Sequence, residues 1–168
     1  MTPDLFWIPG PWRGRLAVIT RPRGGDWLED EVKGWRLAGI NVVVSLLESE
    51  EAEQLGLSLE CKIAANSYVR VISFPVPDRG LPSSTEAFLG LMQQVCQELE
   101  SGLTVAVHCR QGVGRSGLTA IGLLLNSGMN VDDAIESVSK ARGITAPETA
   151  EQLSWIRALA GSRVALAR

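Results

Sequence analysis

The chain has 168 residues, of which 45% are hydrophobic and 21% charged, and its formal net charge at pH 7 is −3. This length and composition fit one globular domain, residues 1–168, with a core of its own. Because charges of both signs are interspersed and no apolar run approaches the roughly 20 residues that span a bilayer, nothing indicates nucleic-acid binding or stable membrane association.

The N-terminus and the cysteines favour a reducing compartment. Residues 1–4 lack the basic-then-apolar order of a secretion signal. Three cysteines at unrelated spacings, Cys61, Cys96 and Cys109, do not form a disulfide framework. We therefore expect a cytoplasmic protein, in which Cys61 and Cys96 are inert packing residues and Cys96 lies on the core side of a helix.

The first half of the chain is predicted to alternate between strands and helices. A short strand at 16–20 precedes a helix at 26–38, for which Asp26 is the expected N-cap. A buried strand at 42–47 follows. A helical stretch at 50–65, broken near Gly56, leads to a strand at 68–74 and a polar loop at 75–83.

The second half continues the alternation and then becomes helical. A long helix at 84–100 ends at Gly102, and five of its apolar residues recur at helical spacing: Phe88, Leu91, Met92, Val95 and Leu99. A strand at 103–108 precedes three helices near 116–127, 131–141 and 147–160, the last with Pro147 in a favoured early position. Strands separated by helices predict an α/β fold, with a mostly parallel central sheet and helices on both faces.

Seven residues after the strand at 103–108 form a candidate anion-binding loop: Cys109-Arg110-Gln111-Gly112-Val113-Gly114-Arg115. Ser116 opens the apolar stretch that predicts the next helix, so strand, tight loop and helix N-terminus follow in order. At such a junction the loop N–H groups and the helix dipole converge on one point. We expect residues 110–115 to hold a phosphate there.

The two ends of this loop carry groups suited to phosphoryl transfer. A thiol among backbone donors, at a helix N-terminus and beside a guanidinium, ionises readily, so we expect Cys109 to be a thiolate at neutral pH. Arg115 supplies a planar charged fork that grips two phosphate oxygens, which a lysine cannot do. Gly112 and Gly114 permit backbone angles that turn the amides inward. Ser116 is expected to donate a hydrogen bond to the Cys109 sulfur.

The motif His108-Cys109-x-x-Gly112-x-x-Arg115-Ser116 resembles the active-site loop of the cysteine-dependent protein phosphatases. An upstream segment, Phe74-Pro75-Val76-Pro77-Asp78, is similar to the general-acid loop of their dual-specificity branch. Weaker similarity extends to residues 41–48 and 142–152. The resemblance implies the three-layer α/β/α fold of the small dual-specificity phosphatases and hydrolysis through a cysteinyl-phosphate intermediate.

The resemblance also implies individual roles. Cys109 would be the nucleophile, Arg115 would hold the phosphoryl oxygens, and Asp78 would protonate the leaving oxygen and then activate water. Pro-Asp-x-Gly is also a common turn sequence, which is the structural alternative for Asp78. Glu48 is a weaker candidate for the acid.

Supporting roles are open to more than one interpretation. Adjacent residues that leave a strand point to opposite faces, so His108, the only histidine, is not expected to act as a base for Cys109. The resemblance implies that His108 instead hydrogen-bonds toward the loop and helps to hold the thiolate. Gln152 would position the hydrolytic water, or it would be a plain glutamine on a helix surface. Arg79 and Arg110 flank the expected pocket, either as solvated side chains or as a bias toward acidic substrates.

The sequence differs from two groups of related phosphatases in ways that concern the substrate. The acid loop has Val76 where strictly tyrosine-specific relatives have tryptophan, and no counterpart of their phosphotyrosine-recognition insertion is found. Phosphoinositide phosphatases of the superfamily carry two lysines between cysteine and arginine, whereas this loop has only Arg110. We predict a phosphatase of phosphorylated proteins or peptides that acts on phosphotyrosine, with phosphoserine and phosphothreonine as further candidates.

Three alternatives stay open to different degrees. A phosphoinositide or other non-protein phosphatase would use the same chemistry. A catalytically silent phosphate-binding module is disfavoured because nucleophile, arginine and acid are all present, and rhodanese-like sulfur transfer would leave the acid loop without a purpose. A single histidine and the lack of a Cys-x-x-Cys pair give no support to a metal site, and we expect no cofactor. The sequence carries no signal for an oligomeric state.

Overall fold

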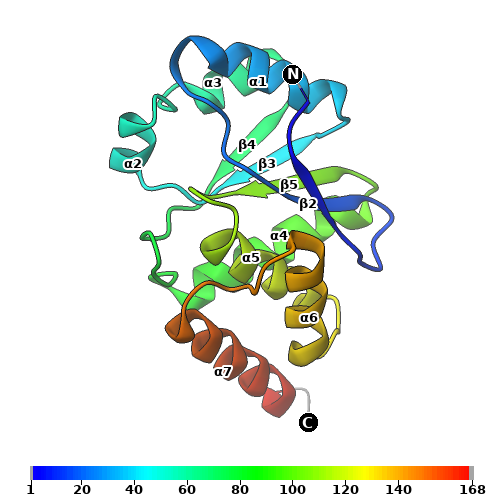
Figure 1. The fold of residues 1–168 in the computed structure, drawn as a ribbon. Helices are drawn as coiled ribbons and strands as arrows, with labels where there is room; N and C mark the ends of the chain where they lie inside the picture. The colour runs from blue at the N-terminus through cyan, green and yellow to red at the C-terminus, as the bar shows by residue number, and fades with distance from the viewer. Residues whose placement is uncertain (1, 167–168) are drawn as a thin grey trace.

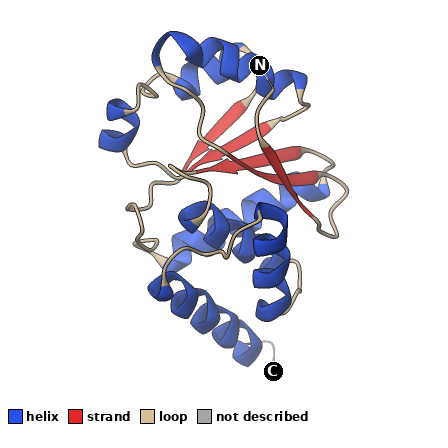
Figure 2. Cartoon of the chain, viewed as in Figure 1, coloured by secondary structure: helices blue, strands red, loops and turns tan. Residues whose placement is uncertain are grey.

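A five-stranded sheet forms the centre of the described structure (Figure 2). The structure is a computed structural model that describes the backbone of residues 2–166 and the side chains of residues 2–162. The strands are β1 (Leu5–Ile8), β2 (Arg15–Ile19), β3 (Val42–Ser45), β4 (Arg70–Ser73) and β5 (Thr104–His108). Their order across the sheet is β1-β2-β5-β3-β4, with β1 antiparallel to β2 and the other pairs parallel.

Helices cover both faces of this sheet (Figure 1). One face carries α1 (Leu28–Leu37) and α3 (Glu60–Asn66), with the short α2 (Ser49–Gln54) at the edge where β3 ends. The other face carries α4 (Thr85–Glu100), α5 (Gly114–Asn126) and α6 (Val131–Arg142). The last helix, α7 (Ala150–Leu166), packs on α5 and lies furthest from the sheet. The predicted three-layer α/β/α architecture is therefore confirmed.

The strands supply each layer with alternate side chains. In β2, Leu16 and Val18 belong to the core beneath α4, α5 and α6, whereas Ala17 and Ile19 belong to the core beneath α1 and α3. This alternation follows from the two-residue repeat of a strand. Because the inner parallel strands are buried on both faces, they read as continuous apolar runs in the sequence.

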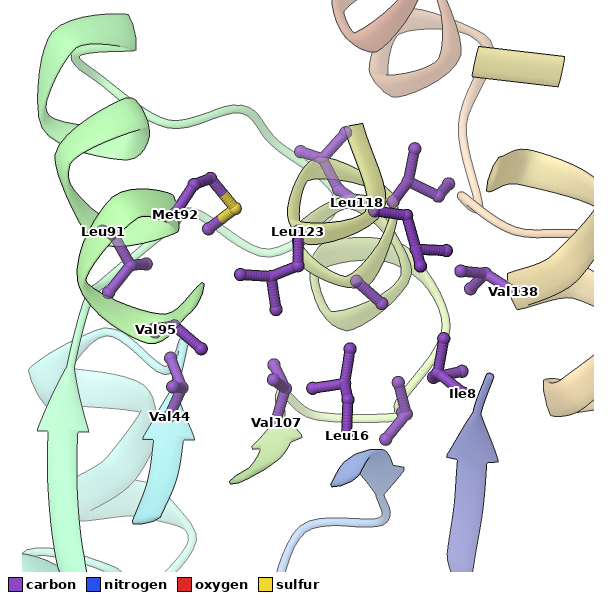
Figure 3. Close-up of a cluster of buried hydrophobic side chains, with 14 of the residues drawn as sticks. Ile8, Leu16, Val44, Leu91, Met92, Val95, Val107, Leu118, Leu123 and Val138 are labelled. Carbon is purple, nitrogen blue, oxygen red and sulfur yellow. The ribbon is translucent and has the colours of Figure 1, made fainter. Parts of the chain in front are cut away.

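Helix α5 is buried along its length, because it lies between the sheet and the other helices of its layer. Figure 3 shows Leu123 of α5 on the side of the helix that faces the strands, with α4 to one side and α6 to the other. A Cβ at Gly122 would lie 2.8 Å from the Phe88 ring, so α4 approaches α5 closely at that glycine. The helix that follows the candidate phosphate loop is thus fixed by packing on every side.

Most predicted elements are confirmed, with four differences. Strand β1 was not predicted, because four apolar residues do not by themselves reveal that the chain turns at residues 9–14 and pairs antiparallel with β2. Asp26 is not an N-cap, since it lies in a 3-10 turn, Gly25–Trp27, and Trp27 precedes α1. Helix α5 begins at Gly114 rather than Ser116.

The fourth difference concerns the last helix. Pro147 lies before α7 and is not in its first turn. Thr149 supplies the cap, because its Oγ1 accepts a hydrogen bond of 3.0 Å from the Gln152 amide. The helix therefore begins at Ala150.

Candidate active site

The loops that follow β3, β4 and β5 meet at one edge of the sheet, where parallel strands end together (Figure 1). Cys109 comes directly after β5, and its side chain is buried. The Gly112 amide lies 3.3 Å from the Cys109 Sγ and donates to it. Helix α5 then begins at Gly114, so Arg115 and Ser116 belong to its first turn. The loop thus supplies one backbone donor to the sulfur, the Gly112 amide.

Arg115 is nearly inaccessible to solvent and reaches across to the segments after β3 and β4. Its Nη1 and Nη2 donate to the two carboxylate oxygens of Glu51 at 2.8 and 2.7 Å, a bidentate pair. Its Nη1 also donates to the carbonyls of Val76 at 2.8 Å and Leu46 at 3.3 Å. Burial alone would lower the pKa of Arg115, but the bonds to Glu51 and the nearby anionic groups outweigh it and raise that pKa. The guanidinium is a fixed cation.

Glu51 is a residue of the candidate site that was not predicted from the sequence. It lies in α2, where the Glu48 side chain accepts from the Glu51 amide and the Glu51 side chain accepts from the Glu48 amide at 3.4 Å. The hydrogen bond from Arg115 holds the pKa of Glu51 below its ordinary value of 4.5. A carboxylate in a short helix 64 residues upstream carries no local signal of this role.

Asp78 reaches the same arginine from the loop after β4. Its side chain is 54% exposed, and its Oδ1 accepts from the Arg115 Nη2 at 3.2 Å. Val76, two residues earlier, is buried in the core, so the loop is anchored immediately before the aspartate. The structure therefore brings Cys109, Arg115 and Asp78 together from two separate segments of the chain.

A pocket of about 510 Å³ opens beside this group. It is lined mainly by α2 and by the acid loop, and its residues are Glu48, Ser49, Glu50, Glu51, Gln54, Pro75, Asp78 and Arg110. Four of the eight carry carboxylates. Arg110, the single cation, lies 3.6 Å from a Glu51 oxygen. The surroundings of the phosphate loop on this side are acidic.

Arg79 and Arg110 each have an acidic partner in the structure. Arg79 forms a hydrogen-bonded ion pair of 2.7 Å with Glu148, and Arg110 is paired with Glu51. Glu48, the weaker acid candidate, lines the pocket but caps α2 with its carboxylate.

His108 is fully buried behind the loop. Its Nδ1 lies 3.4 Å from the Cys109 carbonyl oxygen, in agreement with a hydrogen bond toward the loop. Its Nε2 lies 2.5 Å from an oxygen of Glu60, a buried carboxylate of α3 that the sequence analysis did not single out. The imidazole is thus held on both sides.

Ser116 does not form its predicted hydrogen bond to the Cys109 sulfur. Its Oγ is buried and has no hydrogen-bond partner among the described residues. Because α5 begins two residues earlier than predicted, Ser116 lies within the first turn of the helix.

Gln152 is buried and is not the helix-surface glutamine of the alternative interpretation. Its Oε1 accepts from the amides of Glu148 and Thr149 at 3.2 Å, and its Nε2 donates to the Gly80 carbonyl at 3.0 Å. A Cβ placed on Gly114 would lie 3.2 Å from this Oε1. Gln152 thus joins the start of α7 to the acid loop, beside the phosphate loop.

The other two cysteines differ from each other. Cys96 is buried on the core side of α4, as predicted, and its thiol lies 3.7 Å from the Leu123 carbonyl. Cys61 is exposed and is therefore not a packing residue. Partial burial, together with the charge of Glu60, raises the pKa of the Cys61 thiol, so Cys61 is mainly protonated at neutral pH.

Within residues 2–166, no cluster of histidine, cysteine and carboxylate side chains has the arrangement of a metal site. In the same range no helix combines the length and apolar character needed to cross a bilayer.

Comparison with known proteins places this geometry in a family. The family model described as "Tc-R-P: Polymorphic toxin system, DSP-PTPase phosphatase" matches residues 17–129. A curated relative from Arabidopsis thaliana, "Phosphatidylinositol 3,4,5-trisphosphate 3-phosphatase and protein-tyrosine-phosphatase PTEN1", is 34% identical over 83 residues, which are 46% of this chain and 19% of that protein. The mouse "Cyclin-dependent kinase inhibitor 3" is 31% identical over 83 residues, 49% of this chain and 39% of that protein. The chain spans less than two thirds of these relatives.

Solved structures share the whole fold. Kinase associated phosphatase aligns with a TM-score of 0.88 at 17% identity, over 96% of both chains. Tk-PTP in its active form aligns with a TM-score of 0.77 at 27% identity, over 96% of this chain and 99% of that chain.

Proposed function

The chain belongs to the DSP-PTPase phosphatase family of polymorphic toxin systems, a family of cysteine-dependent phosphatases, and we propose that it hydrolyses phosphomonoesters on proteins. Phosphotyrosine is the proposed first substrate, with phosphoserine and phosphothreonine as further ones. The observation that carries the proposal is the meeting of Cys109, Arg115 and Asp78 at one edge of the sheet. We further propose that residues 1–168 act as one catalytic domain.

In the first step, the Cys109 thiolate attacks phosphorus and the bond from phosphorus to the ester oxygen breaks. The loop amides and the Arg115 fork hold the phosphoryl oxygens, which spread in the transition state. Asp78 gives its proton to the departing oxygen, so the product leaves as a neutral alcohol or phenol. Glu51 supports this step by holding the guanidinium in one plane through two hydrogen bonds.

In the second step, water hydrolyses the cysteinyl phosphate. Asp78, now a carboxylate, takes a proton from the water that attacks phosphorus, and Cys109 leaves as a thiolate. Gln152 is proposed to support this step indirectly, because its hydrogen bond to Gly80 anchors the loop that carries Asp78.

The acidic pocket favours a protein substrate over a phosphoinositide. A phosphoinositide headgroup with several phosphates needs cations around the phosphate that is cleaved, and potentials of opposite sign are what select charged partners. Here Glu48 and Glu50 line the pocket, and its only cation, Arg110, is paired with Glu51. A phosphoinositide remains the second candidate, because the name of the relative PTEN1 includes both activities.

A substrate panel tests the proposal. We expect phosphotyrosine and phosphoserine peptides to be hydrolysed with a higher kcat/KM than soluble phosphoinositides. Cys109→Ser should abolish turnover without a change in melting temperature, because it removes a nucleophile and little volume. Cys61→Ser, at the exposed cysteine, is the matched control and should keep full activity. Faster hydrolysis of the phosphoinositides would replace the proposed substrate class, and full activity of Cys109→Ser would contradict the mechanism.

A further inference from the structure

Two carbonyl groups of the phosphate loop are bonded to an arginine outside the loop. Arg142, the last residue of α6, donates from Nε to the Gly112 carbonyl at 2.8 Å and from Nη2 to the Gln111 carbonyl at 3.1 Å. The guanidinium thus forms a fork that holds two successive peptide groups from the outer side of the loop.

These bonds fix the direction of the loop amides. In a trans peptide the C=O and the following N–H point in opposite directions. The Gln111 carbonyl points to Arg142, and the Gly112 amide of the same peptide group donates to the Cys109 Sγ at 3.3 Å. By the same geometry, the Gly112 carbonyl on Arg142 turns the Val113 amide away from Arg142, toward the anion side.

Without a hydrogen bond to its carbonyl, a peptide group beside Gly112 could flip at a low cost in energy, because Gly112 has a positive φ of 74° and no side chain. A turned peptide would replace an N–H donor by a carbonyl oxygen facing the phosphate. One missing donor in such a cradle typically costs about 10²-fold or more in rate. The hydrogen bonds from Arg142 to the two carbonyls oppose this flip.

Arg142 is itself held by the N-terminal strand. Its guanidinium carbon lies 4.1 Å from the centre of the Phe6 ring in β1, and α6 packs against β1. A guanidinium stacked on an aromatic face keeps its N–H groups in the plane of the stack, free to donate sideways. The ring therefore orients the fork toward the two carbonyls.

We infer that Arg142, stacked on Phe6, is a positioning residue that keeps the amides of Gly112 and Val113 turned toward the anion. This inference rests on the proposed function for its importance to turnover. The orientation of the loop amides, and anion binding by the loop, can be tested without the proposed function.

The test compares two reagents that alkylate Cys109. Iodoacetate is an anion that the loop should attract, whereas iodoacetamide is neutral, so the ratio of their rate constants at Cys109 reports the anion cradle without any turnover. We expect Arg142→Ala to lower this ratio, and kcat/KM for p-nitrophenyl phosphate, by at least about tenfold. Arg142→Lys, which keeps the charge at the end of α6 but loses the fork, should lose nearly as much.

Two further variants separate positioning from general stability. Arg157→Ala removes an exposed arginine that pairs with Asp132, and it should leave ratio and turnover unchanged. Phe6→Leu keeps the strand apolar but removes the ring, and should cause a loss of a few-fold. A low, non-denaturing concentration of guanidinium chloride should restore part of the ratio in Arg142→Ala and have no such effect on Arg142→Lys.

A wild-type ratio in folded Arg142→Ala would overturn the inference. If that variant does not fold, a wild-type ratio in both Arg142→Lys and Phe6→Leu would overturn it equally. A wild-type protein that hydrolyses no phosphate ester, but whose alkylation ratio falls in Arg142→Ala, would refute the proposed function and support the inference.

Discussion

At the scale of single residues, Arg115 has two kinds of hydrogen-bond partner. Buried partners hold it in place, and one exposed partner can be replaced by a ligand. Glu51 and the two carbonyls that accept from Arg115 are buried, whereas Asp78 is more than half exposed. Asp78 therefore accepts from an Arg115 N–H group that, in the proposed mechanism, donates to an incoming phosphate oxygen. In the proposed mechanism Asp78 then takes a proton from solvent and, as the protonated acid, gives it to the ester oxygen.

Asp78→Ala tests this double role. General acid catalysis matters in proportion to the basicity of the leaving oxygen, so phosphotyrosine and phosphoserine should lose about 10²-fold or more in kcat. An activated ester such as p-nitrophenyl phosphate should lose less. Affinity for vanadate should be unchanged or tighter, because a competing anion is removed from Arg115. Equal losses for all leaving groups would identify Asp78 as a turn residue, and Glu48 would then be the acid to test.

Gly112 is a second residue with a specific requirement. Its φ of 74° lies in the left-handed region, and a Cβ there would lie 3.2 Å from the Ile19 carbonyl oxygen. Gly112→Ala should therefore strain the loop, with a stability loss of about 1–3 kcal/mol and a fall in kcat/KM of at least about tenfold.

Gly128→Ala is the matched control for the Gly112 variant. Gly128 also has a positive φ, 102°, but a Cβ there meets nothing within 4 Å. It should lose stability from backbone strain and keep its turnover per folded molecule. Urea unfolding and p-nitrophenyl phosphate assays measure both quantities, and normal activity of Gly112→Ala would show that the loop conformation is not critical.

At the scale of elements, the acid loop is held by three side-chain contacts to α5, to α7 and to the segment just before α7. Arg115 of α5 donates to the Val76 carbonyl, and Gln152 of α7 donates to the Gly80 carbonyl. Arg79, which has a positive φ of 58°, points to Glu148 just before α7. Asp78 lies between these anchors. Asp78, the proposed general acid, is thus exposed while the backbone on either side of it is fixed, which would limit the entropy lost when a substrate binds.

At the scale of the whole molecule, the Glu51–Arg115 pair joins α2, which follows β3, to α5 on the opposite side of the sheet. Both side chains are buried, so removing one partner leaves an unpaired charge inside the protein. Breaking such a pair typically costs about 3–5 kcal/mol. Loss of either partner is therefore expected to destabilise the fold as well as to disturb the geometry of the site.

The pH dependence of stability should reveal the Glu51–Arg115 pair. The pKa of Glu51 is lowered in the folded state, so its contribution is fully present above the ordinary value of 4.5 and is lost as the pH falls through the folded-state pKa. Glu51→Gln should be destabilised by a few kcal/mol at pH 7. The difference in free energy of unfolding between wild type and Glu51→Gln should become smaller below about pH 4.5.

Urea unfolding at a series of pH values measures this gap. Glu50→Gln, at the exposed neighbouring position, is the control and should follow the wild type at every pH. A gap between wild type and Glu51→Gln that stays constant down to pH 3 would mean that the ionised carboxylate does not stabilise the fold.

The sequence alone determined the features that depend on neighbours along the chain. The alternation of strands and helices follows from local periodicity, and the phosphate loop lies within seven residues, so its Cys109, its glycines and Arg115 could be recognised together. The resemblance added Asp78, which lies in the loop after β4. Strand β1 was not predicted, because its pairing with β2 depends on the turn between the two strands.

Only the tertiary structure decided which distant residues complete the site. Glu51, Glu60 and Arg142 lie 64, 48 and 30 residues from their partners in or beside the loop. Each is an ordinary charged residue of a helix when viewed in sequence. The strand order β5-β3-β4 sets α2 and the acid loop beside α5, and the packing of α6 on β1 sets Arg142 beneath the loop. Burial then favours those contacts in which every charge finds a partner, and such complementarity exists only in the folded chain.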